Sequence, residues 1–176
     1  MNPLPLADRA LLRNQCLVDG HFVGAPSDPV KNPADGAFIA NVPRCGAEEA
    51  TASVEAAKRA FCAWAARTAK ERSQILRRWF GMTQHRHDLA SILTAEQGKP
   101  LAEALGEIDY AAAYVESYGE EAKRIAGEIL PSHRSDARIL VMRQPIDVVA
   151  AITPWNFPAA MITHKLRQRL PPASLS

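Results

Sequence analysis

One short run of residues constrains the fold of this 176-residue chain more than any other: Asp147-Val148-Val149-Ala150-Ala151-Ile152-Thr153. It is nearly all apolar, and it ends at Pro154, where new helical material begins. An apolar run of this length is typical of a parallel strand that is buried on both faces and leads into a βα unit. Because such a strand needs helices to cover it, the sequence predicts an α/β fold.

The residues before this run supply helices and hairpins. Asp19-Gly20 suits a tight turn between two short apolar segments, which predicts a hairpin. Helices are predicted where apolar residues recur at helical spacing, with Gly81 weakening the second and Gly127 suited to cap the last. The predicted segments are a hairpin over 16–18 and 21–23, a proline-rich loop over 26–36, a strand over 37–42, and helices over 47–66, from about 70 to 80, resuming at 89–93, and over 101–125.

Charge and composition exclude several classes of protein. Lys and Arg number 21 against 19 Asp and Glu, and they form no basic block, which argues against a nucleic-acid binder. No stretch is long and apolar enough for a membrane span, and the N-terminus is too polar for a secretory signal. Three cysteines at no metal spacing predict free thiols, no metal site and a cytoplasmic location.

Four residues could be taken for metal ligands or nucleophiles, but a simpler structural explanation exists for each. His85 and His87 are two apart in a predicted helix, so they point apart and are expected to be solvated rather than to share a metal. Cys62 lies on the predicted apolar side of a helix and is expected to act as a small hydrophobe. Cys45 comes after an Arg that could lower its thiol pKa, but no base is near it in the sequence.

The segment Ala150-Ala151-Ile152-Thr153-Pro154-Trp155-Asn156-Phe157-Pro158 resembles the signature of the aldehyde dehydrogenase superfamily at the first strand of its cofactor domain. The resemblance extends over residues 12 to about 166. It is most similar to the succinate-semialdehyde dehydrogenase branch at Glu96-Gln97-Gly98-Lys99-Pro100. Further matching segments lie at 18–23, 32–36, 56–61 and 94–104.

This resemblance implies an activity and a set of site residues. Members of the family oxidise an aldehyde to the acid with NAD or NADP, using a Cys thiolate, a Glu base and an oxyanion donor. The motif assigns the oxyanion donor to Asn156. It places Ile152, Thr153, Pro154 and Trp155 along the dinucleotide. Taken without the motif, Asn156 would be expected only to cap the next helix.

The sequence departs from the family in two places. His164 stands where the succinate-semialdehyde branch has an Arg thought to hold the substrate carboxylate, and His is a weaker partner for that group. The tail from Leu166 has no resemblance to the corresponding segment of the family, and none of the three cysteines matches the catalytic one. A frameshift is the hypothesis for the tail, and inactivity is expected of the chain alone.

The expected architecture is the N-terminal part of the aldehyde dehydrogenase fold, leading into the first strand of an incomplete Rossmann-like doubly wound sheet. In family members a β-ribbon takes part in subunit association, so the resemblance implies that the parent enzyme is a homo-oligomer. The alternative stays open that the chain is a non-catalytic remnant, or an interaction module that pairs with a full-length homologue. The expected parts are a helical and hairpin part of the cofactor domain over 1–136, an oligomerisation-type β-ribbon over 137–147, the first βα unit over 148–166 and an aberrant tail over 167–176.

Overall fold

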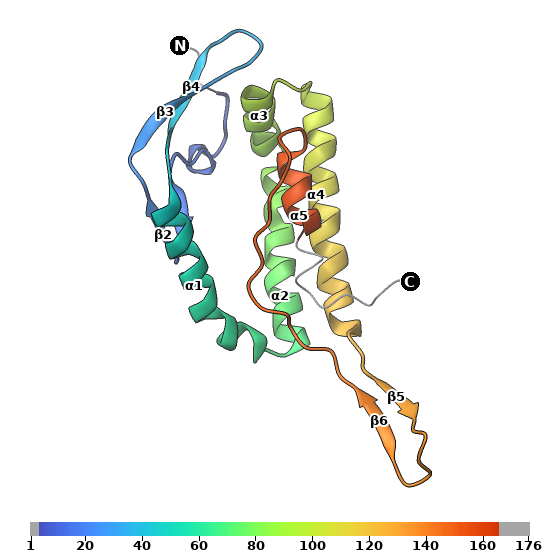
Figure 1. Ribbon diagram of the computed structural model, residues 1–176. Coiled ribbons are helices and arrows are strands. Elements are labelled where there is room, and N and C mark those ends of the chain that lie inside the picture. Colours follow the sequence, from blue (N-terminus) through green and yellow to red (C-terminus); the bar gives the residue numbers. More distant parts are fainter. Residues whose placement is uncertain (1–3, 166–176) are drawn as a thin grey trace.

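The computed structural model describes residues 4–165, and the aberrant tail expected over 167–176 lies outside them. Helices α2 (Ala69–Phe80), α3 (Arg86–Gln97), α4 (Leu101–Glu121) and α5 (Pro158–Lys165) pack together, while α1 (Ala47–Ala65) stands apart from them (Figure 1). The strands form three antiparallel pairs: β1 (Cys16–Val18) with β2 (His21–Val23), β3 (Pro26–Lys31) with β4 (Phe38–Pro43), and β5 (Glu128–Pro131) with β6 (Arg138–Val141).

The core lies around α4, which packs against α2, α3 and α5. Small residues on its buried face let the neighbouring helices approach closely, and Ala104, Ala111 and Ala112 are almost completely buried. The core contains two hydrophobic clusters. One consists of Ala90, Leu93, Ala104 and Ile108, and the other of Leu76, Val115 and Tyr118.

The predicted helices and hairpin are confirmed to within a few residues. Asp19 and Gly20 both have positive φ, 52° and 78°, as the tight turn between β1 and β2 requires. Thr68 and Glu71 form a capping box at the start of α2. A 3₁₀ segment from Gly81 to His85 separates α2 from α3, where the sequence predicted a weakened helix.

The loop predicted over residues 26–36 is wrong for its first half, which forms strand β3. Pro26 and Pro29 are tolerated because, among residues 4–165, β3 pairs only with β4, so its other edge needs no backbone donors. Gly127 is not the expected helix cap either, since α4 ends at Glu121. A Cβ at Gly127 would overlap the Val141 carbonyl oxygen, so close approach to the ribbon explains this glycine.

The ribbon lies earlier in the chain than the predicted 137–147. Its two strands pair Glu128 with Val141 and Pro131 with Arg138, and the hairpin projects away from the helices (Figure 1). Its apolar side chains are uncovered: Ile129 is 72% and Leu140 67% exposed.

The strand predicted over the apolar run 147–153 is not formed. Residues 142–157 belong to no helix or strand, although α5 comes after them as expected for a βα unit. A strand requires a neighbouring strand to which its backbone is hydrogen-bonded, and within residues 4–165 no strand pairs with this run. Ala150, Ala151 and Ile152 are exposed instead, and Val148 and Val149 are half-buried.

The predicted apolar stripe of α1 is only partly covered. Phe61 and Trp64 on α1, Leu76 on α2 and the segment from Pro145 to Val148 line an apolar cavity of about 350 Å³. Within the described part of the chain, no helix has the length and apolar character needed to cross a membrane.

Candidate functional site

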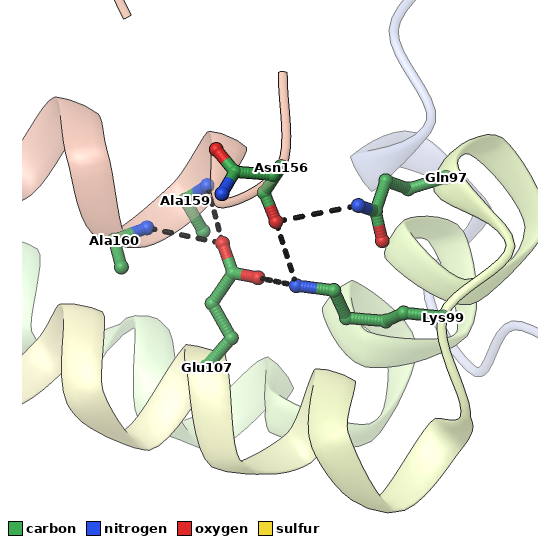
Figure 2. Close-up of polar contacts among 6 residues, drawn as sticks. All are labelled: Gln97, Lys99, Glu107, Asn156, Ala159 and Ala160. Atoms are coloured by element: carbon green, nitrogen blue, oxygen red, sulfur yellow. Dashed lines mark hydrogen bonds and ion pairs between the residues drawn. The ribbon is translucent and has the colours of Figure 1, made fainter. Parts of the chain in front are cut away.

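The candidate site is the turn that leads into α5, residues Pro154–Phe157, where it meets the connection between α3 and α4. In Figure 2 the backbone carbonyl of Asn156 in this turn is joined to Gln97 and Lys99, and Glu107 of α4 lies beneath the start of α5. These residues are close in space although almost sixty positions separate Lys99 from Asn156.

Local structure places Lys99 at this turn. Gly98 ends α3 in the left-handed conformation, with φ of 81°, and Pro100 occupies the position before the first residue of α4. A Cβ on Gly98 would lie 2.8 Å from Pro33 Cγ, so both the positive φ and the close contact require glycine. The resulting sharp connection holds Lys99 between the two helices.

Glu107 links α4 to α5. Its side chain is completely buried, and its Oε1 accepts hydrogen bonds from the backbone N–H of Ala159 at 2.9 Å and of Ala160 at 3.2 Å. Its Oε2 forms an ion pair with the Lys99 ammonium. Glu107 therefore does what an N-cap side chain would do, and its negative charge is well placed at a helix N-terminus.

Lys99 joins this carboxylate to the turn. Its Nζ donates a hydrogen bond to the backbone carbonyl of Asn156 at 3.0 Å and lies 4.1 Å from the centroid of the Phe157 ring. Gln97 Nε2 donates to the same carbonyl at 3.3 Å. Two neighbouring side chains, Lys99 and Gln97, thus hold the turn through a single backbone carbonyl.

The Asn156 side chain takes no part in this network. Within residues 4–165 its amide forms no hydrogen bond, and the residue is exposed. The alternative interpretation of Asn156 as a helix cap is therefore wrong. The Phe157 carbonyl accepts the first bond of α5, from Met161, and Glu107 satisfies the next amides. The Asn156 amide is left available to a ligand.

The four residues expected along a dinucleotide form an open strip. Ile152 is 84% exposed and Trp155 66% exposed, while Thr153 is only partly covered and Pro154 is exposed. The two amides at the start of α5 are already bonded to Glu107, so they are not free to bind a phosphate. The described residues alone do not fit NAD(P): they offer one wall and no enclosure.

His164 lies on α5, where it contacts α4. Its ring meets the Tyr114 ring edge-on, with centroids 5.0 Å apart. The residue is partly buried, beside the fully buried Thr163. This packing orients the imidazole at the position where the family resemblance has an arginine.

The remaining candidates are distant from this turn in the fold. His85 and His87 are exposed, and the described residues contain no cluster of metal-ligating side chains. Cys62 is exposed on α1, so its expected place on the packed face is wrong. The pKa of Cys45 is raised, mainly by its hydrogen bond with Cys16, so the neighbouring Arg that could have lowered it does not dominate. Arg44 instead pairs with Asp28.

Sequence reasoning assigned no role to Glu107, Lys99 or Gln97. A signal for Glu107 was present, because it shares the buried face of α4 with Ala104, Ile108 and Ala111. A carboxylate on an apolar helix face is expected only where it is paired. The partner was not predictable, since it lies eight residues away across a helix break.

Comparison with known proteins matches residues 24–171 to the aldehyde dehydrogenase family, and the chain belongs to this family. It is 53% identical over 166 residues to the succinate-semialdehyde dehydrogenase [NADP(+)] of Escherichia coli K12, and 55% identical over 166 residues to a glutarate-semialdehyde dehydrogenase of Pseudomonas aeruginosa.

Each of these alignments covers 92% of this chain and 34% of the relative, so the chain spans about a third of the relatives' length. The crystal structure of an E. coli NADP-dependent enzyme superposes with a TM-score of 0.90 at 52% identity, covering 94% of this chain and 35% of that one. The fold is thus the N-terminal part of the aldehyde dehydrogenase fold, of mixed α and β structure.

Proposed function

We propose that this chain is the N-terminal portion of an NAD(P)-dependent enzyme that oxidises succinate semialdehyde or a related small aldehyde to the carboxylic acid. In that enzyme Asn156 donates a hydrogen bond to the aldehyde oxygen as negative charge develops on it. Ile152 to Trp155 lie along the dinucleotide, and the enzyme is a cytoplasmic homo-oligomer. The likeness to succinate- and glutarate-semialdehyde dehydrogenases supports the substrate class.

The observation that carries this proposal is the way the turn at Asn156 is held. Lys99 and Gln97 bind its backbone carbonyl, and Glu107 fixes the next helix, α5. The side-chain amide is left without a partner among the described residues. A neutral N–H donor on a fixed backbone suits an oxyanion, because preorganised donors stabilise developing charge without reorganising during the reaction.

The 176 residues assayed alone are expected to be inactive. An oxyanion donor stabilises a tetrahedral adduct only if a nucleophile forms it. The three cysteines lie in β1, before α1 and on α1, whereas Asn156 is bonded to Gln97 and Lys99 at the α3–α4 connection (Figure 2). We expect no reduction of NAD or NADP with succinate semialdehyde, as measured by absorbance at the nicotinamide band.

A chimera provides the matched positive control. Residues 1–165 of this chain replace the corresponding part of the E. coli succinate-semialdehyde dehydrogenase, and the rest comes from that enzyme. The proposal expects turnover by the chimera and none by the isolated chain. Turnover by the isolated chain, lost on Asn156→Ala, would overturn the expected inactivity, and an inactive chimera that assembles and binds NADP would contradict the assignment of function.

Replacing His164 by arginine in the chimera should favour aldehydes with a distal carboxylate. An arginine is permanently charged and can grip a carboxylate with two parallel hydrogen bonds, whereas a histidine offers at most one. We expect kcat/KM for succinate semialdehyde to rise by at least about tenfold, mostly through a lower KM, since a charge-assisted hydrogen bond contributes about 1.5–3 kcal/mol. Butyraldehyde, which lacks the carboxylate, serves as the control substrate, and an equal gain for both aldehydes would argue against this role.

One observation favours a second, non-catalytic function, in which the chain pairs with a full-length homologue. The β5–β6 ribbon exposes Ile129 and Leu140 and projects from the helices (Figure 1). Uncovered apolar side chains on an open strand pair are typical of an association surface. Co-expression with a tagged full-length homologue tests this function: co-purification that is lost on Ile129→Lys supports it, and a chain that remains unbound contradicts it.

A further inference from the structure

We propose that Cys16 and Cys45 form a reversible intrachain disulfide when the chain meets a low-molecular-weight disulfide such as oxidised glutathione. Nothing in the aldehyde oxidation proposed for this chain uses these two thiols. They are the first residue of β1 and a residue of the loop between β4 and α1.

The two sulfur atoms are already in contact. The Sγ of Cys45 lies 3.5 Å from the Sγ of Cys16, and both residues are exposed. A disulfide bond is about 2.05 Å long, so the sulfurs must approach by about 1.5 Å. Rotation of two exposed side chains can supply that movement, and a small oxidant can reach both sulfurs.

The surrounding backbone holds this contact in place. Cys16 pairs with Val23 across the hairpin, which places it near Gly24. A Cβ on Gly24 would lie 2.5 Å from Pro43 Cβ and 3.5 Å from the Cys45 Sγ, so the hairpin packs tightly against the end of β4. Gly24 has a φ of 87°, which favours glycine and allows this approach.

The disulfide would give the hairpin a second attachment to α1. The first is the ion pair between Asp19 in the hairpin turn and Arg59 on α1, at 2.8 Å. That pair is exposed and therefore contributes little by itself. Cys45 lies just before the first residue of α1, so a covalent link there would fasten the β1–β2 hairpin at the opposite end of the contact.

The exchange proceeds in two steps through a mixed disulfide. Cys45 donates its S–H to the Cys16 sulfur, and this hydrogen bond raises the pKa of the Cys45 thiol, so the first attack is assigned to Cys16. The Cys16 thiolate attacks oxidised glutathione and releases one glutathione thiolate, which takes up a proton. Cys45 then loses its proton and attacks the Cys16 sulfur, releasing the second glutathione. Two thiols are oxidised and one glutathione disulfide is reduced to two thiols.

The third cysteine serves as an internal reference. Cys62 lies on α1, fifteen residues beyond the first residue of that helix, which corresponds to about 22 Å along its axis. In the folded chain Cys62 is therefore too far from Cys45 to bond with it. In an unfolded chain Cys45 should instead bond more readily with Cys62 than with Cys16. Cys45 and Cys62 are closer in sequence than Cys16 and Cys45, and shorter loops close more readily.

The experiment equilibrates the full chain with a glutathione redox buffer, quenches free thiols by alkylation and maps disulfides by peptide mass spectrometry. We expect Cys16–Cys45 to exceed Cys45–Cys62 by at least about tenfold in buffer, with Cys62 alkylated. In concentrated guanidinium chloride Cys45–Cys62 should become the more abundant intrachain bond. Addition of dithiothreitol should return all three thiols.

Single variants provide the matched controls. Cys62→Ser should leave the Cys16–Cys45 bond unchanged, whereas Cys16→Ser and Cys45→Ser should each leave the chain without a folded-state intrachain disulfide. The proposal is overturned if the three pairs form in the same proportions with and without denaturant, if intermolecular bonds predominate in dilute solution, or if no disulfide forms. Preference for Cys16–Cys45 in buffer alone supports it.

Discussion

Replacing Asn156 by alanine in the chimera should lower kcat by about 100- to 1000-fold, the usual effect of removing one oxyanion donor. The effect should fall on kcat rather than on KM, because the charge that this amide stabilises develops only as the tetrahedral adduct forms. The structure leaves the donor on a turn whose backbone carbonyl is held by Lys99 and Gln97, so truncation at Cβ should leave the turn intact.

An aspartate at the same position is the matched control for shape. Asn156→Asp keeps the size of the side chain but offers only acceptors at neutral pH and adds a negative charge. It should therefore be at least as inactive as the alanine variant, while NADP binding, measured by fluorescence titration, stays within about twofold of the unsubstituted chimera. If Asn156→Ala retained kcat within about threefold, Asn156 would not be the oxyanion donor.

Replacing Glu107 by leucine in the isolated chain should detach α5 from α4. The substitution leaves the Lys99 ammonium buried without its anion and removes the acceptor of two amides at the start of α5. Breaking a buried ion pair on one side costs about 3–5 kcal/mol. Amide hydrogen exchange in the peptide over 158–165 should therefore accelerate at least about tenfold, as measured by mass spectrometry.

The control for Glu107 lies on the same helix. Glu103 is one turn away and exposed, and its replacement by leucine should leave exchange in α5 unchanged. Glu107→Gln keeps an acceptor for the two amides but not the charge that balances Lys99, so its effect should be intermediate. Unaltered protection of α5 in Glu107→Leu would mean that apolar packing alone holds this helix.

The helices and the first hairpin were predictable because their determinants are local. The turn at Asp19-Gly20, the capping box at Thr68 and Glu71, and the apolar periodicity of α4 are each contained within a few consecutive residues. The family was predictable for a similar reason, since its signature from Ala150 to Pro158 is one uninterrupted segment.

Features that depend on distant partners were not predictable. The apolar run at 147–153 has the composition of a buried strand, but a strand forms only beside another, and none of the described strands pairs with it. The role of Glu107 depends on Lys99, Ala159 and Ala160, which come together only when α4 and α5 pack. The apolar stripe of α1 was predictable, but not whether other residues cover it. In the structure Phe61 and Trp64 of this stripe line a cavity.

We propose that the buried Glu107–Lys99 pair acts on the reaction by holding the turn that presents Asn156. The most direct test is kcat of the chimera with Asn156→Ala, with Glu107→Gln and with both. If Glu107 acts only through Asn156, Glu107→Gln alone should lower kcat by about tenfold and should cause no further loss when Asn156 is already alanine. If the fold-losses in kcat of the two single variants multiplied in the double variant, Glu107 would act on the reaction independently of Asn156, which would contradict this role.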